Sequence, residues 1–185
     1  KNFLETYPDA VVINLGCGLC TRFRRTDNGS VRWYEIDFPE VIEFRRKFFG
    51  ENDRYQFIAK SIFDFTWIDQ IQCILSQPLM ILMEEVSPYL SKAENQALIS
   101  QIHDRLAPTE LVFDVLNRKS AKSSRRHDTV SKTDAEFKSG IDSGKELETW
   151  GPGITLKDEI YYLTQFAKHP QRLPLWARYL SFILV

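Results

Sequence analysis

The sequence contains few of the residues from which disulfide frameworks and metal centres are built. It has three cysteines, an odd number, and three histidines in 185 residues. Cys17 and Cys20 form a C-x-x-C pair, but no second C-x-x-C or H-x-x-x-H is present to complete a zinc site. We therefore expect no metal. We interpret both cysteines as small residues of a turn in a reducing, cytoplasmic protein, with a redox or metal half-site as the lesser alternative.

Strong net charge and long apolar runs are also missing. The formal net charge is −1, which gives no electrostatic reason to expect binding to nucleic acid or to a membrane surface. No apolar run is long enough to span a bilayer, and we expect no signal peptide. The length, with 43 % hydrophobic and 13 % aromatic content, predicts one globular domain over residues 1–185. The composition leaves the oligomeric state open.

A glycine turn follows the first predicted strand. Residues 10–15 form an apolar, β-branched run broken only by Asn14, which is typical of a parallel strand buried on both faces. Gly16 and Gly18 then allow a sharp turn and the close approach of a ligand. A single G-x-G also occurs in turns that bind nothing. Thr21 stands where the nicotinamide fingerprint requires Gly or Ala, which counts against a bound NAD.

An acidic residue lies at the end of the second predicted strand, residues 31–36. Asp37 follows Gly18 by 37 − 18 = 19 positions, which is where a ribose diol is held in nucleotide-binding sheets. The alternative is that Asp37 only caps the helix that begins near Pro39. Glu35 shares the face of Asp37 and is the second candidate for the ribose.

Further strands are predicted at residues 55–59, 78–83 and 111–116, with helices between them. This alternation predicts an α/β protein with a doubly wound, mostly parallel sheet. The tip after residue 59 lies where such sheets hold adenine, so Ser61 or Asp64 is a candidate for the ring amine and Ile62 or Phe63 for the ring face, with an ordinary loop as the alternative. Glu84 and Glu85 follow the fourth strand, at the edge where ligands bind.

Two segments carry a specific resemblance. N-L-G-C-G-L-x-T-R-F over residues 14–23 and R-W-Y-E-I-D-F-P-E-V-I over residues 32–42 resemble the leucine carboxyl methyltransferase family, and within it the bacterial polyketide O-methyltransferases of the tetracenomycin type. The resemblance covers residues 5–165. It implies the class I, Rossmann-like methyltransferase fold and S-adenosylmethionine as the cofactor. Family members also carry an N-terminal helical region over the cofactor, which this sequence is expected to lack.

The resemblance also selects among the candidate site residues. It favours Ser61 and Ile62 for the adenine and matches Glu84 to the family's cofactor-contacting acid, with a capping or structural acid as the alternative reading of Glu84. The cofactor-binding set is therefore predicted to be Gly16, Gly18, Asp37, Ser61, Ile62 and Glu84. One departure from the bacterial branch is Cys20, which stands where that branch usually has an acidic residue.

The pattern changes after the fifth strand. Residues 117–132 are polar and basic, and residues 117–170 are predicted to form a helical and loop insertion over the acceptor site, including a helix over 156–166. Arg125 and Arg126 are the candidates for binding an anionic substrate, although a solvated loop is the safer interpretation of this stretch. Tyr89 and His127 are the only candidates for a catalytic base, should a base be required.

The predicted function is that of an S-adenosylmethionine-dependent O-methyltransferase, acting on a carboxylate or hydroxyl of a small, polyketide-type molecule. A carboxylate is already ionised near neutral pH and requires no base, which agrees with the lack of a Ser-His-Asp constellation. Two alternatives stay open. One is a homologue that binds S-adenosylmethionine without turnover, and the other is an NAD-dependent oxidoreductase.

Overall fold

The computed structural model describes residues 2–71, 77–122 and 135–161. By its packing the chain divides into two compact units, Lys1–Ser143 and Gly144–Val185. No helix in the described part of the chain combines the length and the apolar character needed to cross a membrane.

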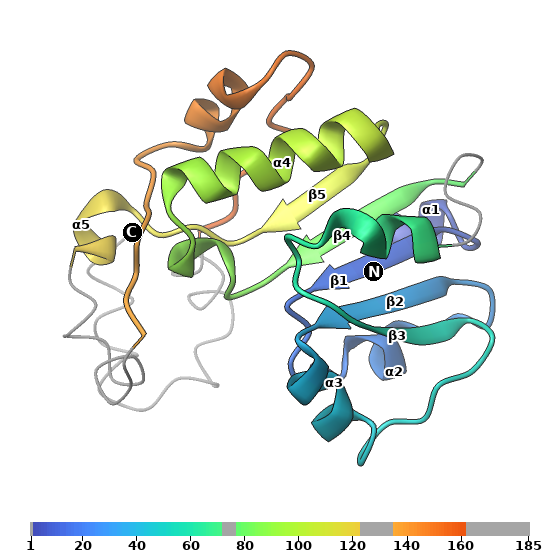
Figure 1. Ribbon diagram of the computed structural model, residues 1–185. Coiled ribbons are helices and arrows are strands. Elements are labelled where there is room, and N and C mark those ends of the chain that lie inside the picture. The colour runs from blue at the N-terminus through green and yellow to red at the C-terminus, as the bar shows by residue number, and fades with distance from the viewer. Residues whose placement is uncertain (1, 72–76, 123–134, 162–185) are drawn as a thin grey trace, which may run out of the picture. The chain divides into compact units, whose positions relative to one another are not determined.

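The first unit is built on a five-stranded sheet (Figure 1). Its strands are β1 (Val11–Leu15), β2 (Arg32–Asp37), β3 (Tyr55–Ala59), β4 (Leu79–Met83) and β5 (Glu110–Phe113). They lie in the order β3-β2-β1-β4-β5, and every neighbouring pair is parallel, so all five carboxyl ends meet at one edge. The chain order reverses between β1 and β4, and ligands of open α/β sheets bind at such a switch point.

Short helices connect the strands. The α-helices are α1 (Asn2–Thr6), α2 (Arg22–Thr26), α3 (Pro39–Arg45), α4 (Lys92–Leu106) and α5 (Arg118–Ala121), and the 3-10 helices are η1 (Phe65–Gln70), η3 (Ser87–Tyr89) and η6 (Gly144–Trp150). The predicted α/β sheet is confirmed, and each predicted strand lies within two or three residues of its observed bounds.

Each face of the sheet has its own core, because successive side chains of a strand point to opposite faces. Val11 and Ile13 of β1 belong to a cluster with Leu98 of α4. Val12, between them, belongs to a second cluster with Phe23 of α2 and further residues of α3 and β3. Helices therefore cover both faces, which is the doubly wound arrangement that the sequence predicted.

The predicted helix over 156–166 is wrong for the part that the structure describes. Residues 154–161 form no helix. The backbone N–H of Leu156 instead donates to the Glu148 carboxylate at 2.9 Å, and the N–H of Gly144 donates to Glu159 at 3.1 Å. These contacts satisfy the backbone locally and override the helical preference of the sequence.

Candidate functional site

The turn between β1 and α2 requires its two glycines. Gly16 and Gly18 have φ angles of +67° and +47°, in the left-handed region that favours glycine. The N–H groups of Gly16 and Cys17 both donate to the carbonyl of Ile36, at 2.9 and 3.2 Å. The turn is therefore fastened to the carboxyl end of β2.

Each glycine also meets a different spatial requirement. A Cβ on Gly16 would lie 2.3 Å from a methyl of Val86, in the segment after β4, so the close approach of these two segments excludes any side chain. A Cβ on Gly18 would meet nothing within 4 Å. Open space therefore lies over Gly18 on the side where a ligand can approach the backbone.

Asp37 joins the tip of β2 to this turn. Its Oδ2 accepts the N–H of Gly18 at 2.8 Å, and its Oδ1 accepts the N–H of Phe38 at 2.8 Å. Helix α3 has Phe38 at its N-cap and no side-chain capping bond, so Asp37 is not the cap of that helix. A carboxylate has about four acceptor positions, which leaves room for further hydrogen bonds from a ligand.

A cavity of about 450 Å³ opens beside the turn. It is lined by Asn14, Gly16, Cys17, Gly18, Leu19, Cys20, Arg22, Glu84 and Glu85. Arg22 of α2 and Glu84, directly after β4, form an ion pair within this lining. The structure thus brings three of the predicted residues, Gly16, Gly18 and Glu84, to one cavity and places Asp37 against its glycine turn.

The segment after β4 is strained and acidic. Glu85 has a φ of +56°, which is uncommon for a residue with a side chain. Its N–H donates to Oδ1 of Asp114, after β5, at 2.7 Å. Burial raises the pKa of the Asp114 carboxyl, and the charges of Glu84 and Glu85 raise it further, while the bond from the Glu85 N–H opposes the rise.

Ser61 and Ile62 follow β3 at the same edge of the sheet. The N–H of Lys60, just before them, donates to the carbonyl of Asp37 at 2.9 Å, so their segment starts beside the tip of β2. Ser61 Oγ accepts the N–H of Phe63, and Ile62 is only 9 % exposed and packs in the core on the α4 face. Their predicted contact with adenine stays a prediction.

The candidates for the acceptor side are only partly placed. Tyr89 ends η3, outside the residues that line the cavity, and its ring contacts Phe137 with centroids 5.4 Å apart. Burial, with the nearby charges of Glu85 and Asp114, raises the pKa of Tyr89, which counts against its use as a base at neutral pH. Arg125, Arg126 and His127 lie outside the described residues.

Comparison with known proteins identifies the family of the chain. The family described as Leucine carboxyl methyltransferase matches residues 4–103, more than half of the chain. The chain belongs to this leucine carboxyl methyltransferase family. The matched range contains the glycine turn, Asp37 and Glu84, and membership of the family confirms the predicted cofactor, S-adenosylmethionine.

Two curated relatives agree with this family. The chain is 30 % identical over 158 residues to the tetracenomycin polyketide synthesis O-methyltransferase TcmP of Streptomyces glaucescens, covering 85 % of this chain and 58 % of TcmP. It is 26 % identical over 187 residues to the S-adenosyl-L-methionine-dependent methyltransferase dpfgK of Gibberella zeae, covering 91 % of this chain and 61 % of that protein. The chain thus spans about three fifths of the length of these relatives.

Solved structures confirm the fold class of the family member. One that resembles it is an S-adenosylmethionine-dependent methyltransferase from Anabaena variabilis, with a TM-score of 0.58 and 14 % identity. The similarity covers 82 % of this chain and 68 % of the other. At this identity the likeness concerns the fold alone, which is the predicted class I, Rossmann-like methyltransferase fold.

The residues at the sheet edge fit the family's cofactor. Gly18 leaves open space over the backbone, and Asp37 retains acceptor positions suited to two ribose hydroxyls. Glu84 supplies a carboxylate to the cavity, which is suited to the ammonium group of an amino acid. Asn14, the one polar residue of β1, is buried, and its side-chain amide donates to Glu35 at 2.7 Å.

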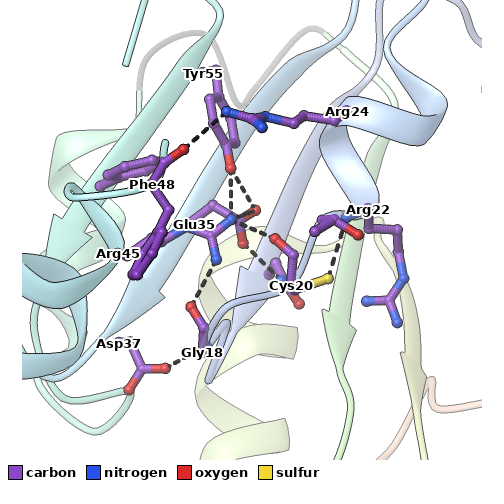
Figure 2. A network of polar contacts seen from close by, with 12 residues as sticks. Gly18, Cys20, Arg22, Arg24, Glu35, Asp37, Arg45, Phe48 and Tyr55 are labelled. Carbon is purple, nitrogen blue, oxygen red and sulfur yellow. Dashed lines mark hydrogen bonds and ion pairs between the residues drawn. The ribbon is translucent and has the colours of Figure 1, made fainter. Parts of the chain in front are cut away.

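A buried charge pair behind the turn was missed from the sequence (Figure 2). Glu35 and Arg45 are fully buried, with the guanidinium and the carboxylate 2.7 Å apart. Glu35, the second candidate for binding the ribose, is therefore paired with Arg45 in the protein interior and is not available to a ribose. Two sequence signals could have indicated this pair. Glu35 lies within a strand predicted to be covered on both faces, and Arg45 follows the apolar Ile42 by three positions, on the same face of its helix.

Proposed function

We propose that the protein to which this chain belongs transfers a methyl group from S-adenosylmethionine to an oxygen of a small organic acceptor, most directly a carboxylate. The observation that carries the proposal is the bond between Gly18 N–H and Asp37, which joins an open glycine turn to a ribose-binding carboxylate beside the cavity. The family match, which spans these residues, supports the same function.

Each residue at the edge has a role in this proposal. Asp37 accepts hydrogen bonds from the ribose hydroxyls, and Gly16 and Gly18 admit the amino acid end. Glu84 pairs with the ammonium group in place of Arg22, and this exchange frees the Arg22 guanidinium for the carboxylate of the same amino acid. Ser61 and Ile62 border the adenine.

The chemistry needs little from the protein beyond placement. When bound, the cofactor supplies a methyl group on a sulfonium leaving group; the C–S bond breaks with its electron pair going to sulfur while a C–O bond forms to the acceptor. A carboxylate acceptor is ionised at neutral pH, so no side chain has to remove a proton. The chain's contribution is to align donor and acceptor and to exclude water. A hydroxyl acceptor would, by contrast, require a base.

More specifically, the acceptor is proposed to be a polyketide-type molecule. The relative TcmP is named as a polyketide synthesis O-methyltransferase, and its similarity covers 85 % of this chain. Arg125 and Arg126 are proposed to grip the anionic acceptor, and His127 is the remaining candidate for a base if the acceptor is a hydroxyl.

The first test is calorimetric titration with S-adenosylhomocysteine, the demethylated cofactor. Wild type is expected to bind, and Asp37→Ala is expected to lose at least about 10-fold in affinity, because two charge-assisted hydrogen bonds to the ribose disappear. Asp53→Ala, which removes an exposed carboxylate in the loop before β3, is the matched control and is expected to bind as wild type does. Equal binding by Asp37→Ala, with its fold intact, would remove Asp37 from the site.

The second test concerns the acceptor. Methyl-labelled S-adenosylmethionine is offered with aromatic carboxylic acids and with matched phenols, and the products are treated with mild alkali. Methyl esters release labelled methanol, whereas methyl ethers keep the label. Label in alkali-stable product alone contradicts the carboxylate proposal, and cofactor binding with no transfer to any acceptor favours the non-catalytic homologue.

A further inference from the structure

The buried arginine behind the glycine turn contacts the turn itself. Arg45 Nη1 donates to the carbonyl of Gly18 and Nη2 donates to the carbonyl of Cys20, each at 2.7 Å (Figure 2). The same Nη2 lies 2.7 Å from Glu35 and 2.6 Å from the Tyr55 hydroxyl. One side chain of α3 thus donates hydrogen bonds to two peptide carbonyls of a turn that lies more than twenty residues away in sequence.

We infer that Arg45 is a positioning residue for the cofactor: held inside the domain by Glu35, it fixes the carbonyl groups of Gly18 and Cys20 and so sets the shape in which the turn meets the cofactor. The inference rests on the proposed function, because the turn is taken there as the cofactor's binding surface. It adds a requirement on a residue that does not line the cavity.

The peptide groups around Gly18 are held from two sides. The Gly18 N–H is bound by Asp37 of β2, and the Gly18 carbonyl is bound by Arg45 of α3. The left-handed φ of Gly18 has no side chain to restrict it, so these two partners restrict it instead. Removal of either partner frees a peptide group beside the space that the ligand enters.

The guanidinium is itself fixed in orientation. Its carbon lies 4.5 Å from the ring centre of Phe49 and 5.2 Å from that of Phe57, and it is fully buried. Glu35 in turn accepts from the Asn14 amide at 2.7 Å and lies 3.2 Å from the Tyr55 hydroxyl. The network therefore links Asn14, which lines the cavity, to the carbonyls of the turn.

Stability alone is a weak reason for such a pair. Two buried charges gain from each other about what their removal from water costs, and uncharged replacements are often as stable. Arg45 Nε has no hydrogen-bond partner among the described residues, so even the burial of this guanidinium is incompletely compensated. The two bonds to the turn give the arginine a role that an apolar pair cannot fill.

The test separates positioning from general stability by removing both charges together. Arg45→Met leaves Glu35 buried without its partner and is expected to lower the melting temperature. The double variant Glu35→Gln with Arg45→Met is expected to recover most of that loss, because no charge stays buried. Its affinity for S-adenosylhomocysteine in calorimetric titration is nevertheless expected to remain about 10-fold or more below wild type, because the carbonyls of the turn still lack their donors.

Arg45→Lys approaches the same question while keeping the charge pair. A lysine ammonium can neutralise Glu35, but it lacks the planar fork that reaches both carbonyls at once. A similar loss of affinity is expected, with a smaller loss of stability. Arg46→Met is the matched control: Arg46 is the next residue, its guanidinium pairs with Glu51 at 3.0 Å, and its side chain is 47 % exposed, so wild-type affinity is expected.

The outcomes are separable. If either the double variant or Arg45→Lys folds and binds S-adenosylhomocysteine with wild-type affinity, Arg45 has a structural role only and the inference is overturned. If affinity follows melting temperature across all variants, including recovery in the double variant, the same conclusion holds. If wild type itself does not bind, it is the proposed function that fails, which the wild-type titration reveals before any variant is compared.

Discussion

Asp114 takes part in the most strained part of the site without lining the cavity. Its carboxylate accepts the N–H of Glu85, whose positive φ is held by that bond. Burial raises the pKa of Asp114, and the charges of Glu84 and Glu85 add to the rise. The folded protein therefore holds this proton more tightly than the unfolded chain does.

This raised pKa gives a pH dependence with a definite sign. As the pH rises past the ordinary carboxyl pKa, about 4, the unfolded chain loses the proton first, so the free energy of unfolding falls until the folded carboxyl has also ionised. Asp114→Asn keeps an acceptor for the Glu85 N–H and removes the titration. The melting temperature of Asp114→Asn relative to wild type is expected to rise as the pH increases above about 4, and to level off once the folded carboxyl has ionised.

Melting curves at a series of pH values provide the measurement. Asp53→Asn is a suitable control, since Asp53 is an exposed residue in the loop before β3. A difference between Asp114→Asn and wild type that is the same at every pH would show that Asp114 is not the titrating group.

At the scale of the elements, α4 has the clearest local signal. Ser91 Oγ accepts the N–H of Glu94, and the Glu94 carboxylate accepts the N–H of Ser91, at 3.2 and 2.7 Å. This capping box satisfies two donors that a helix start otherwise leaves free. The S-x-x-E spacing of Ser91 and Glu94 is typical of this arrangement.

Ser91→Ala is expected to reduce the free energy of unfolding by about 1 kcal/mol. For a protein of this size, that corresponds to a fall in melting temperature of about 2–4 °C. The control Ser100→Ala also removes a serine hydroxyl, but from an exposed position inside α4. It is expected to leave the free energy of unfolding unchanged or slightly higher, because alanine favours the helix interior. Equal losses in both variants would mean that the cap contributes nothing.

The elements that the sequence predicts well are those encoded by short-range patterns. The apolar run of β4 and the S-x-x-E start of α4 are each readable from a few adjacent residues. The segment 156–161 was predicted wrongly as helix: its first N–H, that of Leu156, donates to the side chain of Glu148, a contact that the local helical pattern does not encode.

The site was predicted unevenly for the same reason. Gly16, Gly18 and Asp37 could be placed because a turn and a spacing define them. The pairing of Arg45 with Glu35 could not be predicted, because no local pattern around either residue indicates its partner. A charged residue is also exposed far more often than buried. Only the register between β2 and the helix that follows it brings the two side chains together.

At the scale of the molecule, the proposed binding site joins three strands of the sheet. The glycine turn follows β1, Asp37 ends β2 and Glu84 follows β4, and β1 is paired with both of the others. Unfolding the sheet therefore separates the groups proposed to bind the cofactor, so the unfolded chain is expected to retain no site. A ligand that binds only the folded state stabilises it by mass action.

The predicted effect of S-adenosylhomocysteine on stability is therefore large. At a ligand concentration about 100 times its Kd, the free energy of unfolding is expected to rise by about 2.7 kcal/mol. The melting temperature of wild type should then rise by about 5–10 °C, as measured by scanning calorimetry. Adenosine alone lacks the amino acid end that Glu84 is proposed to bind, so at the same concentration it should give a smaller rise in melting temperature.

The variant Asp37→Ala tests where the ligand binds. At the same concentration of S-adenosylhomocysteine, its melting temperature should rise much less than that of wild type, because its Kd is expected to be higher. If the melting temperature of Asp37→Ala rises as much as that of wild type, the ligand binds elsewhere on the molecule, because this variant lacks the carboxylate proposed to bind the ribose.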